Sequence, residues 1–239
     1  MAALQSENLH PVRVDDQPAV LRLLTDRRDE LASERTRTVN RLHRLFRDLR
    51  PGGAPRKLSA DEAARLLRGR RAATAADQVR LQLARELVAE LRKLDRKLRA
   101  NEQQIEAALK EHGSRLTTIP GVGVILAAKL IGHTGPIERY PTPAHYASYA
   151  GVAPLEVSSG DTRRHRLSRR GDRQLNRALH IAAFTQARMS TTDGYAYVRR
   201  KRHEGKSRRE ALRCLKRRLA DVVYRQLLAD ERARRTAPA

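Results

Sequence analysis

A chain of 239 residues is long enough for one ordinary domain with an extension, or for two small domains. Its 50 Lys and Arg residues against 27 Asp and Glu residues give a formal net charge of +23, while aromatic residues make up only 3%. This composition excludes a thick aromatic core, and the 40% hydrophobic content excludes a wholly disordered chain. No apolar run approaches the roughly 18 residues that span a bilayer, and Cys214 is the only cysteine, so neither a membrane protein nor a disulfide framework is expected.

The positive charge is concentrated in the C-terminal third of the chain. Residues 161–239 carry 23 basic and 8 acidic residues, a net charge of +15. This charge makes a polyanion the expected partner. Binding through a face that neutralises about six phosphates would lose roughly 10³ in affinity between ~50 and ~200 mM salt. A solvated basic surface that only confers solubility is the alternative. Membrane-surface binding is disfavoured because the basic stretches lack apolar faces with aromatic anchors, and we expect a cytoplasmic protein.

The N-terminal half predicts long helices. Asp16-Gln17-Pro18 is typical of a helix start, and the helix is expected to end at Pro51-Gly52-Gly53. Leucines repeat every three or four residues between these limits, and the repeat is interrupted at Arg28, Arg35 and Thr38. A short helix is expected from Ser59 towards Gly69.

A third predicted helix covers residues 74–112 and carries a heptad seam. The seam consists of Leu87, Leu91, Leu94, Leu98, Asn101, Ile105 and Ala108. A polar Asn101 inside such a seam is a device that sets the register of coiled coils. The two long helices predict an antiparallel hairpin of roughly 45–55 Å. Packing within one chain and pairing between two chains are both compatible with the seam, and we favour a dimerisation arm.

A different pattern begins at Gly113. Residues 116–130 have the pattern of a helix-hairpin-helix, in which a helix ends, a tight turn through Gly121, Val122 and Gly123 follows, and an Ala-rich helix begins. The glycines let the backbone approach a phosphate, and the amides at the new helix N-terminus point at it. The alternative is a tight turn between two packed helices.

The rest of the chain alternates helices with a polar segment. Thr142-Pro143 is expected to open a short helix that closes at Gly151, and residues 152–160 contain too many helix breakers for a helix. A basic tract follows from Arg163 to Arg177, and helices are expected over about 172–189 and 207–229.

Two serines lie beside this basic tract. Ser158 and Ser159 precede Gly160, and arginines follow within a few residues. A serine hydroxyl is a poor nucleophile unless it is aimed at an electrophile whose charge is neutralised, and arginines do this for a phosphodiester. Alone, this pattern also describes a flexible polar loop that touches backbone phosphate.

The surrounding sequence resembles one known family. The segments 149–154, 158–160 and 167–179, with Ser168-Arg169-Arg170-Gly171-Asp172 in the last of them, are similar to the C-terminal transposase domain of the one-hundred-and-ten family of insertion-sequence transposases. These proteins are relatives of the pilin-gene invertases and are called bridge-RNA-guided recombinases. The resemblance covers essentially the whole chain, and residues 116–190 are its specific part.

The resemblance implies recombination of DNA by a catalytic serine that attacks the scissile phosphodiester and forms a covalent protein–DNA intermediate. By position the nucleophile is Ser159, with Ser158 as its rival. A structured guide RNA that specifies donor and target, and a homo-oligomer built through the coiled coil, are implied partners. The residues expected to contact DNA are Gly121, Val122, Gly123, Arg163, Arg164, Arg166, Arg169, Arg170, Arg173 and Arg177.

One departure from the family matters. Its members begin with a ribonuclease-H-like domain whose four acidic residues bind Mg²⁺, and here residues 1–15 look like the tail of such a domain. We therefore expect no cofactor or metal ligand in this chain and no activity from the chain alone. Either the transposase is truncated or its start is misplaced. The alternative function is a non-catalytic DNA- or RNA-binding and dimerisation fragment, and this alternative includes inhibition of full-length copies. A purely structural coiled-coil protein would leave the basic tract unexplained.

The predicted fold is all-α, with a long antiparallel coiled-coil hairpin followed by a compact helical domain that contains the helix-hairpin-helix. The predicted organisation is a linker over 1–15, the arm over 16–112, the transposase domain over 113–231 and a disordered tail over 232–239.

Overall fold

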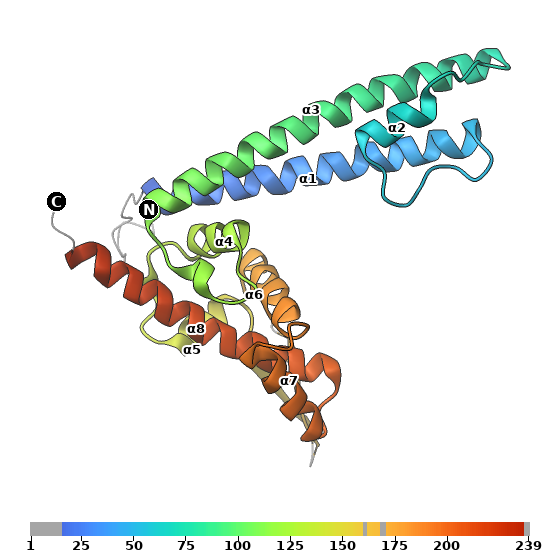
Figure 1. The fold of residues 1–239 in the computed structure, drawn as a ribbon. Helices are drawn as coiled ribbons and strands as arrows, with labels where there is room; N and C mark the ends of the chain where they lie inside the picture. Colours follow the sequence, from blue (N-terminus) through green and yellow to red (C-terminus); the bar gives the residue numbers. More distant parts are fainter. Residues whose placement is uncertain (1–15, 160–161, 168–170, 237–239) are drawn as a thin grey trace, which may run out of the picture. The chain divides into compact units, whose positions relative to one another are not determined.

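The computed structural model describes residues 16–159, 162–167 and 171–236, and helices dominate these ranges (Figure 1). The predicted all-α class is confirmed. The exception among the described residues is one two-stranded antiparallel sheet, which the sequence analysis did not predict. The chain forms two compact units: one is Leu23–Ala107, and the other joins the residues up to Arg22 with those from Ala108 onward.

Within Leu23–Ala107, helix α1 (Asp16–Leu49) and helix α3 (Ala75–His112) run antiparallel (Figure 1). Three side-chain contacts show the direction, because the residue number falls in α3 as it rises in α1. Arg28 donates to Glu102 at 2.8 Å, Arg35 donates to Asp95 at 2.6 Å, and Thr38 donates to Glu90 at 3.3 Å. The three residues that interrupt the leucine repeat of α1 are therefore the ones that meet acidic partners on α3.

The apolar core of this unit lies where α2 (Ala60–Leu67) packs against the two long helices. Ser59 caps α2 as expected, since its side chain accepts the backbone N–H of Glu62. The buried members of the cluster are Leu42, Phe46, Leu58, Ala60, Ala63, Leu67, Leu81, Ala84, Val88 and Leu91. Each long helix buries one stripe of its surface here, which is the reason for the three-to-four-residue periodicity.

Asn101 lies inside the seam of α3 with 5% of its surface exposed. Its Nδ2 donates to the backbone carbonyl of Leu24 at 3.2 Å, and its Oδ1 is buried without a hydrogen-bond partner among the described residues. The seam of α3 is thus occupied by α1 of the same chain. Pairing of the arm with a second chain stays a prediction.

From Ala108 onward, the described part of the second unit contains five further α-helices, two short 3₁₀ helices and the sheet. The α-helices are α4 (Val124–Thr134), α5 (Pro143–Tyr149), α6 (Arg173–Gln186), α7 (Asp193–His203) and α8 (Arg208–Thr236). The 3₁₀ helices are η2 (Leu116–Thr118) and η3 (Ile137–Arg139). Thr142 caps α5 with Pro143 in its first turn, as the sequence indicates.

Buried tyrosines tie these helices together. Tyr146 of α5 is fully buried and its hydroxyl lies 3.2 Å from that of Thr134, while Tyr224 of α8 donates to the carbonyl of Tyr140 at 2.9 Å. Burial raises the pKa of Tyr146, so its hydroxyl stays protonated inside the core. The start of α1 also belongs here, because the backbone of Arg22 packs directly against Gly132 of α4.

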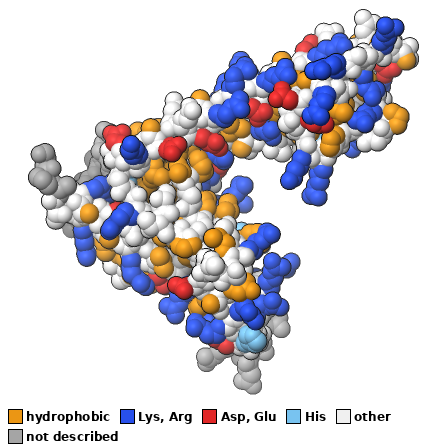
Figure 2. Space-filling view, viewed as in Figure 1, with side chains coloured by type: hydrophobic (Ala, Val, Ile, Leu, Met, Phe, Trp, Pro, Cys, Tyr) orange, Lys and Arg blue, Asp and Glu red, His pale blue; other side chains and the backbone are white. Residues whose placement is uncertain are grey.

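Helix α8 continues to Thr236, so residues 232–236 are helical where the sequence predicted a disordered tail. Among the residues that the structure describes, no helix has both the length and the apolar character that crossing a membrane requires. Lys and Arg side chains are widespread on the visible surface of both units (Figure 2).

Candidate functional site

The predicted nucleophile lies at the end of a β-strand rather than in an irregular loop. Strand β1 (Pro154–Ser159) pairs antiparallel with β2 (Thr162–Leu167), so that Ser159 is opposite Thr162 and Ser158 is opposite Arg163. Three of the predicted DNA contacts, Arg163, Arg164 and Arg166, thus share a strand paired with the serine strand. Gly160, Arg169 and Arg170 lie outside the described residues.

A sequence signal for this hairpin was present. Two runs of six residues are separated by Gly160-Asp161, and a Gly-Asp pair between two strand-like runs is typical of a tight β-hairpin. The signal was missed because the arginines of the second run resemble a solvated basic tract.

Two glycines hold the base of the hairpin. A Cβ atom added to Gly171 would lie 2.2 Å from both the Cα and the backbone N of Gly151, which has a φ of +64°. The N–H of Asp172 donates to the carbonyl of Tyr149 at 2.6 Å beside this crossing. Gly171 is therefore required in the Ser-Arg-Arg-Gly-Asp motif because the two chain segments that frame the hairpin touch there.

Asp172 follows this crossing and begins α6. Its Oδ1 accepts the N–H of Leu175 at 2.8 Å, and its Oδ2 lies 3.7 Å from Nδ1 of the buried His133 in α4. Burial raises the pKa of this carboxyl, but the neighbouring His133 and a hydrogen bond from the backbone N–H of Leu175 outweigh it and hold the pKa below its usual range. The acidic residue of the motif is thus a helix cap that joins α6 to α4.

A buried lysine completes the support of the hairpin base. Asn176 donates through Nδ2 to the carbonyl of Gly151 at 2.7 Å, and its Oδ1 accepts from Nζ of Lys216 in α8 at 2.7 Å. Only 5% of Lys216 is exposed. Burial, with a smaller contribution from Arg213, lowers the pKa of Lys216 to about 8. Sequence reasoning missed Lys216, because nothing in its local pattern separates it from its solvent-facing neighbours.

The turn predicted to contact phosphate packs on α6. Gly121, with a φ of +79°, lies against the carbonyl of Ala182 and the side chain of Thr185, and Val122 is buried. Gly123 has open space around it and no side chain caps the N-terminus of α4. The element before the turn is the single 3₁₀ turn η2. Gly121 and Val122 therefore have a packing role, and a helix-hairpin-helix contact with DNA stays a prediction.

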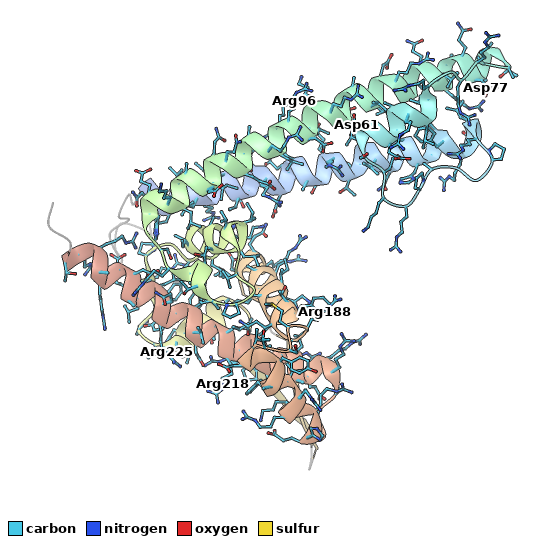
Figure 3. All side chains as sticks on the ribbon, in the orientation of Figure 1. Asp61, Asp77, Arg96, Arg188, Arg218 and Arg225 are labelled. Carbon is cyan, nitrogen blue, oxygen red and sulfur yellow. The ribbon has the colours of Figure 1, made fainter. Side chains whose placement is uncertain are left out.

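The remaining predicted contacts lie on α6. Arg173 and Arg177 are exposed one turn apart on the same face, and Arg188 lies beyond the end of the helix (Figure 3). The guanidinium of Arg188 lies 5.3 Å from the ring of Phe184, which is 40% exposed. Cations beside an accessible aromatic ring match the chemistry that binds nucleic-acid strands.

Among the described residues, no group of three or more His, Cys, Asp or Glu side chains is arranged to hold a metal ion.

Comparison with known proteins identifies the class. Residues 113–199, which contain the hairpin, its glycine base and α6, match the family model for transposases of the IS116/IS110/IS902 family. This segment is therefore a transposase domain. An insertion element IS110 protein of 43.6 kDa from Streptomyces coelicolor is 40% identical over 132 residues, which cover 54% of this chain and 32% of that protein.

Similarity extends beyond this domain. An insertion element IS900 protein of 42 kDa from Mycobacterium paratuberculosis is 29% identical over 272 residues, covering 94% of this chain and 68% of that protein. The pilin gene-inverting protein of Moraxella bovis is 27% identical over 118 residues, covering 48% of this chain and 37% of that protein. The family model thus matches residues 113–199, and similarity to insertion-element proteins extends over most of the chain. It spans one third to about two thirds of the length of these relatives.

Proposed function

We propose that this chain binds DNA and exchanges strands through Ser159. In this reaction the Oγ atom of Ser159 attacks the phosphorus of a phosphodiester, an Oγ–P bond forms and one bridging P–O bond breaks. The departing deoxyribose oxygen takes up a proton and becomes a hydroxyl, while the proton of the serine passes to solvent. A second strand-end hydroxyl reverses the step on a new partner, so no nucleotide energy is consumed.

The observation that carries this proposal is the hairpin within the matched transposase domain. Its register sets Ser158 and Ser159 on one strand and three arginines on the partner strand. Arginines stabilise the extra negative charge that develops on a phosphorus under attack. A structured RNA and further copies of the chain are proposed as partners on the family resemblance alone.

The register also separates the two serines. Successive residues of a strand belong to opposite faces, and directly paired residues belong to the same face. Ser159 thus shares a face of the hairpin with Thr162 and Arg164, whereas Ser158 shares the other face with Arg163. The proposal assigns the reaction to Ser159 and not to Ser158, so substitution of each serine tests it.

The test is covalent trapping on nicked element-end DNA. The full chain is incubated with the DNA, alone and with the N-terminal portion of a longer relative supplied in trans, and adducts that survive denaturation are resolved by gel. With the added portion we expect an adduct from the unmodified chain and from Ser158→Ala, and none from Ser159→Ala.

An adduct that persists in Ser159→Ala refutes the assignment. If no adduct forms even with the added portion, while binding to DNA still falls steeply with salt, the chain is the non-catalytic binding fragment instead.

A further inference from the structure

Helices α7 and α8 and the turn between them form an open basic hollow, most of whose lining lies beyond the transposase segment matched above. It has a volume of about 620 Å³. Arg199, Arg202 and His203 line it from α7, Gly205, Lys206 and Ser207 from the turn, and Arg208 and Glu210 from α8. Figure 2 shows Lys and Arg side chains gathered over this part of the unit. We call this feature the α7–α8 hollow.

The hollow has more basic than acidic side chains, because Glu210 is the one acidic residue beside Arg199, Arg202, Lys206 and Arg208 in its described lining. Glu204 pairs with Arg200 and Lys201, which do not line the hollow, at 3.9 and 2.6 Å. Among the described residues, Arg202, Lys206 and Arg208 form no salt bridge, and all three are exposed. Like charges held around one concavity repel each other, and a bound polyanion relieves that repulsion.

The start of α8 adds positive potential to the same place. The carboxylate of Glu210 accepts hydrogen bonds from the N–H and hydroxyl of Ser207 at 2.9 and 2.6 Å, so it caps the helix rather than pairing with an arginine. Arg208 and Arg209 occupy the first turn, where a cation opposes the helix dipole. Residues that destabilise the helix they belong to, as these arginines do, are expected where they bind a ligand.

We propose that the α7–α8 hollow binds the phosphate backbone of a nucleic acid, as a second contact surface apart from the serine hairpin. The lining is polar and cationic, which disfavours an apolar small molecule. Arginine and lysine side chains converging on an open concavity suit successive phosphodiester groups. The inference rests on the proposed function, because it assumes that the whole chain engages nucleic acid.

The experiment measures binding of the full chain to a DNA duplex and to an RNA hairpin of equal length by fluorescence anisotropy over a salt series. The triple variant Arg202→Gln, Lys206→Gln and Arg208→Gln removes three charges from the hollow. Its control, Arg218→Gln, Arg225→Gln and Arg232→Gln, removes three exposed charges one heptad apart along α8. Two of the control positions are labelled in Figure 3. Thermal melts verify that both variants fold.

Each phosphate contact contributes about 0.9 to the slope of log K against log salt. We expect the hollow variant to lower the slope by about 2 to 3, and the control variant by less than about 1. If this slope decreases for DNA alone, for RNA alone or for both, the result supports the site and identifies the nucleic acid that it binds. Equal behaviour of the two triple variants overturns this inference but leaves the serine proposal standing. Absence of any binding by the unmodified chain overturns both.

Discussion

Lys216 of α8 and Asn176 of α6 are 40 residues apart in the sequence, and Nζ of the lysine donates to Oδ1 of the asparagine at 2.7 Å. Through Nδ2 the same asparagine holds the carbonyl of Gly151, just before the serine hairpin. A buried ammonium thus supports the base of the hairpin from a helix beyond the matched transposase segment.

This lysine predicts a pH-dependent stability. Its pKa of about 8 in the folded chain lies below the ordinary value of 10.5, so between these values the unfolded chain binds the proton more readily. The free energy of unfolding therefore rises with pH in this window. It is lowest below about pH 8, where Lys216 is charged in the folded chain. Relative to Lys216→Met, the unmodified chain should gain up to about 2 kcal/mol between pH 8 and roughly 9.5, measured by urea unfolding at both pH values. An equal pH response in the two proteins would show that Lys216 does not titrate in this range.

The glycine crossing predicts a sharp difference between two alanine substitutions. Gly171→Ala places a Cβ atom 2.2 Å from the backbone of Gly151 and should destabilise the chain by about 2–3 kcal/mol. Gly123→Ala is the control, because its φ is −83° and nothing lies within 4 Å of the added atom, so a loss within about 1 kcal/mol is expected. Urea unfolding of the two variants measures the loss of stability in each. Similar losses in the two variants would contradict the close approach of Gly171 to Gly151.

The arm predicts a measurable coupling between Arg35 and Asp95. Their side chains meet at 2.6 Å and are 34% and 27% exposed. A double-mutant cycle with alanine at both positions should give a coupling energy of about 0.5–1 kcal/mol. The more exposed pair Arg27 and Glu30 on α1 is the control and should give less than about 0.5 kcal/mol. A coupling no larger than that of the control would argue against an arm closed within one chain.

The hairpin register predicts unequal roles for two neighbouring arginines. Arg164 shares the face of Ser159, at a diagonal position that typically lies roughly 7–8 Å away between Cα atoms, whereas Arg163 is opposite Ser158. We expect Arg164→Gln to slow formation of the covalent adduct about 100-fold and Arg163→Gln to slow it less than about 10-fold. The rates come from time courses of adduct formation, and the reverse order would assign the reaction to the other face.

Much of the helical architecture was predictable from local signals. Ser59 and Thr142 cap helices, Pro143 opens one, and the periodic leucines of the arm lie on its buried stripes. These signals work because caps and amphipathic periods are set by residues within a few positions of each other. The strands of the serine hairpin were missed, since the apolar alternation is limited to Leu155 and Val157 and the second run is basic.

The sequence by itself determined that the chain is helical and strongly basic, and its Ser-Arg-Arg-Gly-Asp motif pointed to the transposase family. Only the tertiary structure decided why that motif has its form: Gly171 touches Gly151, Asp172 caps α6 beside His133, and Asn176 is held by Lys216. It also showed that the interruptions of the leucine repeat in α1 meet acidic residues of α3. Such contacts join residues that are distant along the chain. Because a distant partner does not alter the local helix or strand propensity, these contacts can be identified only in the folded structure.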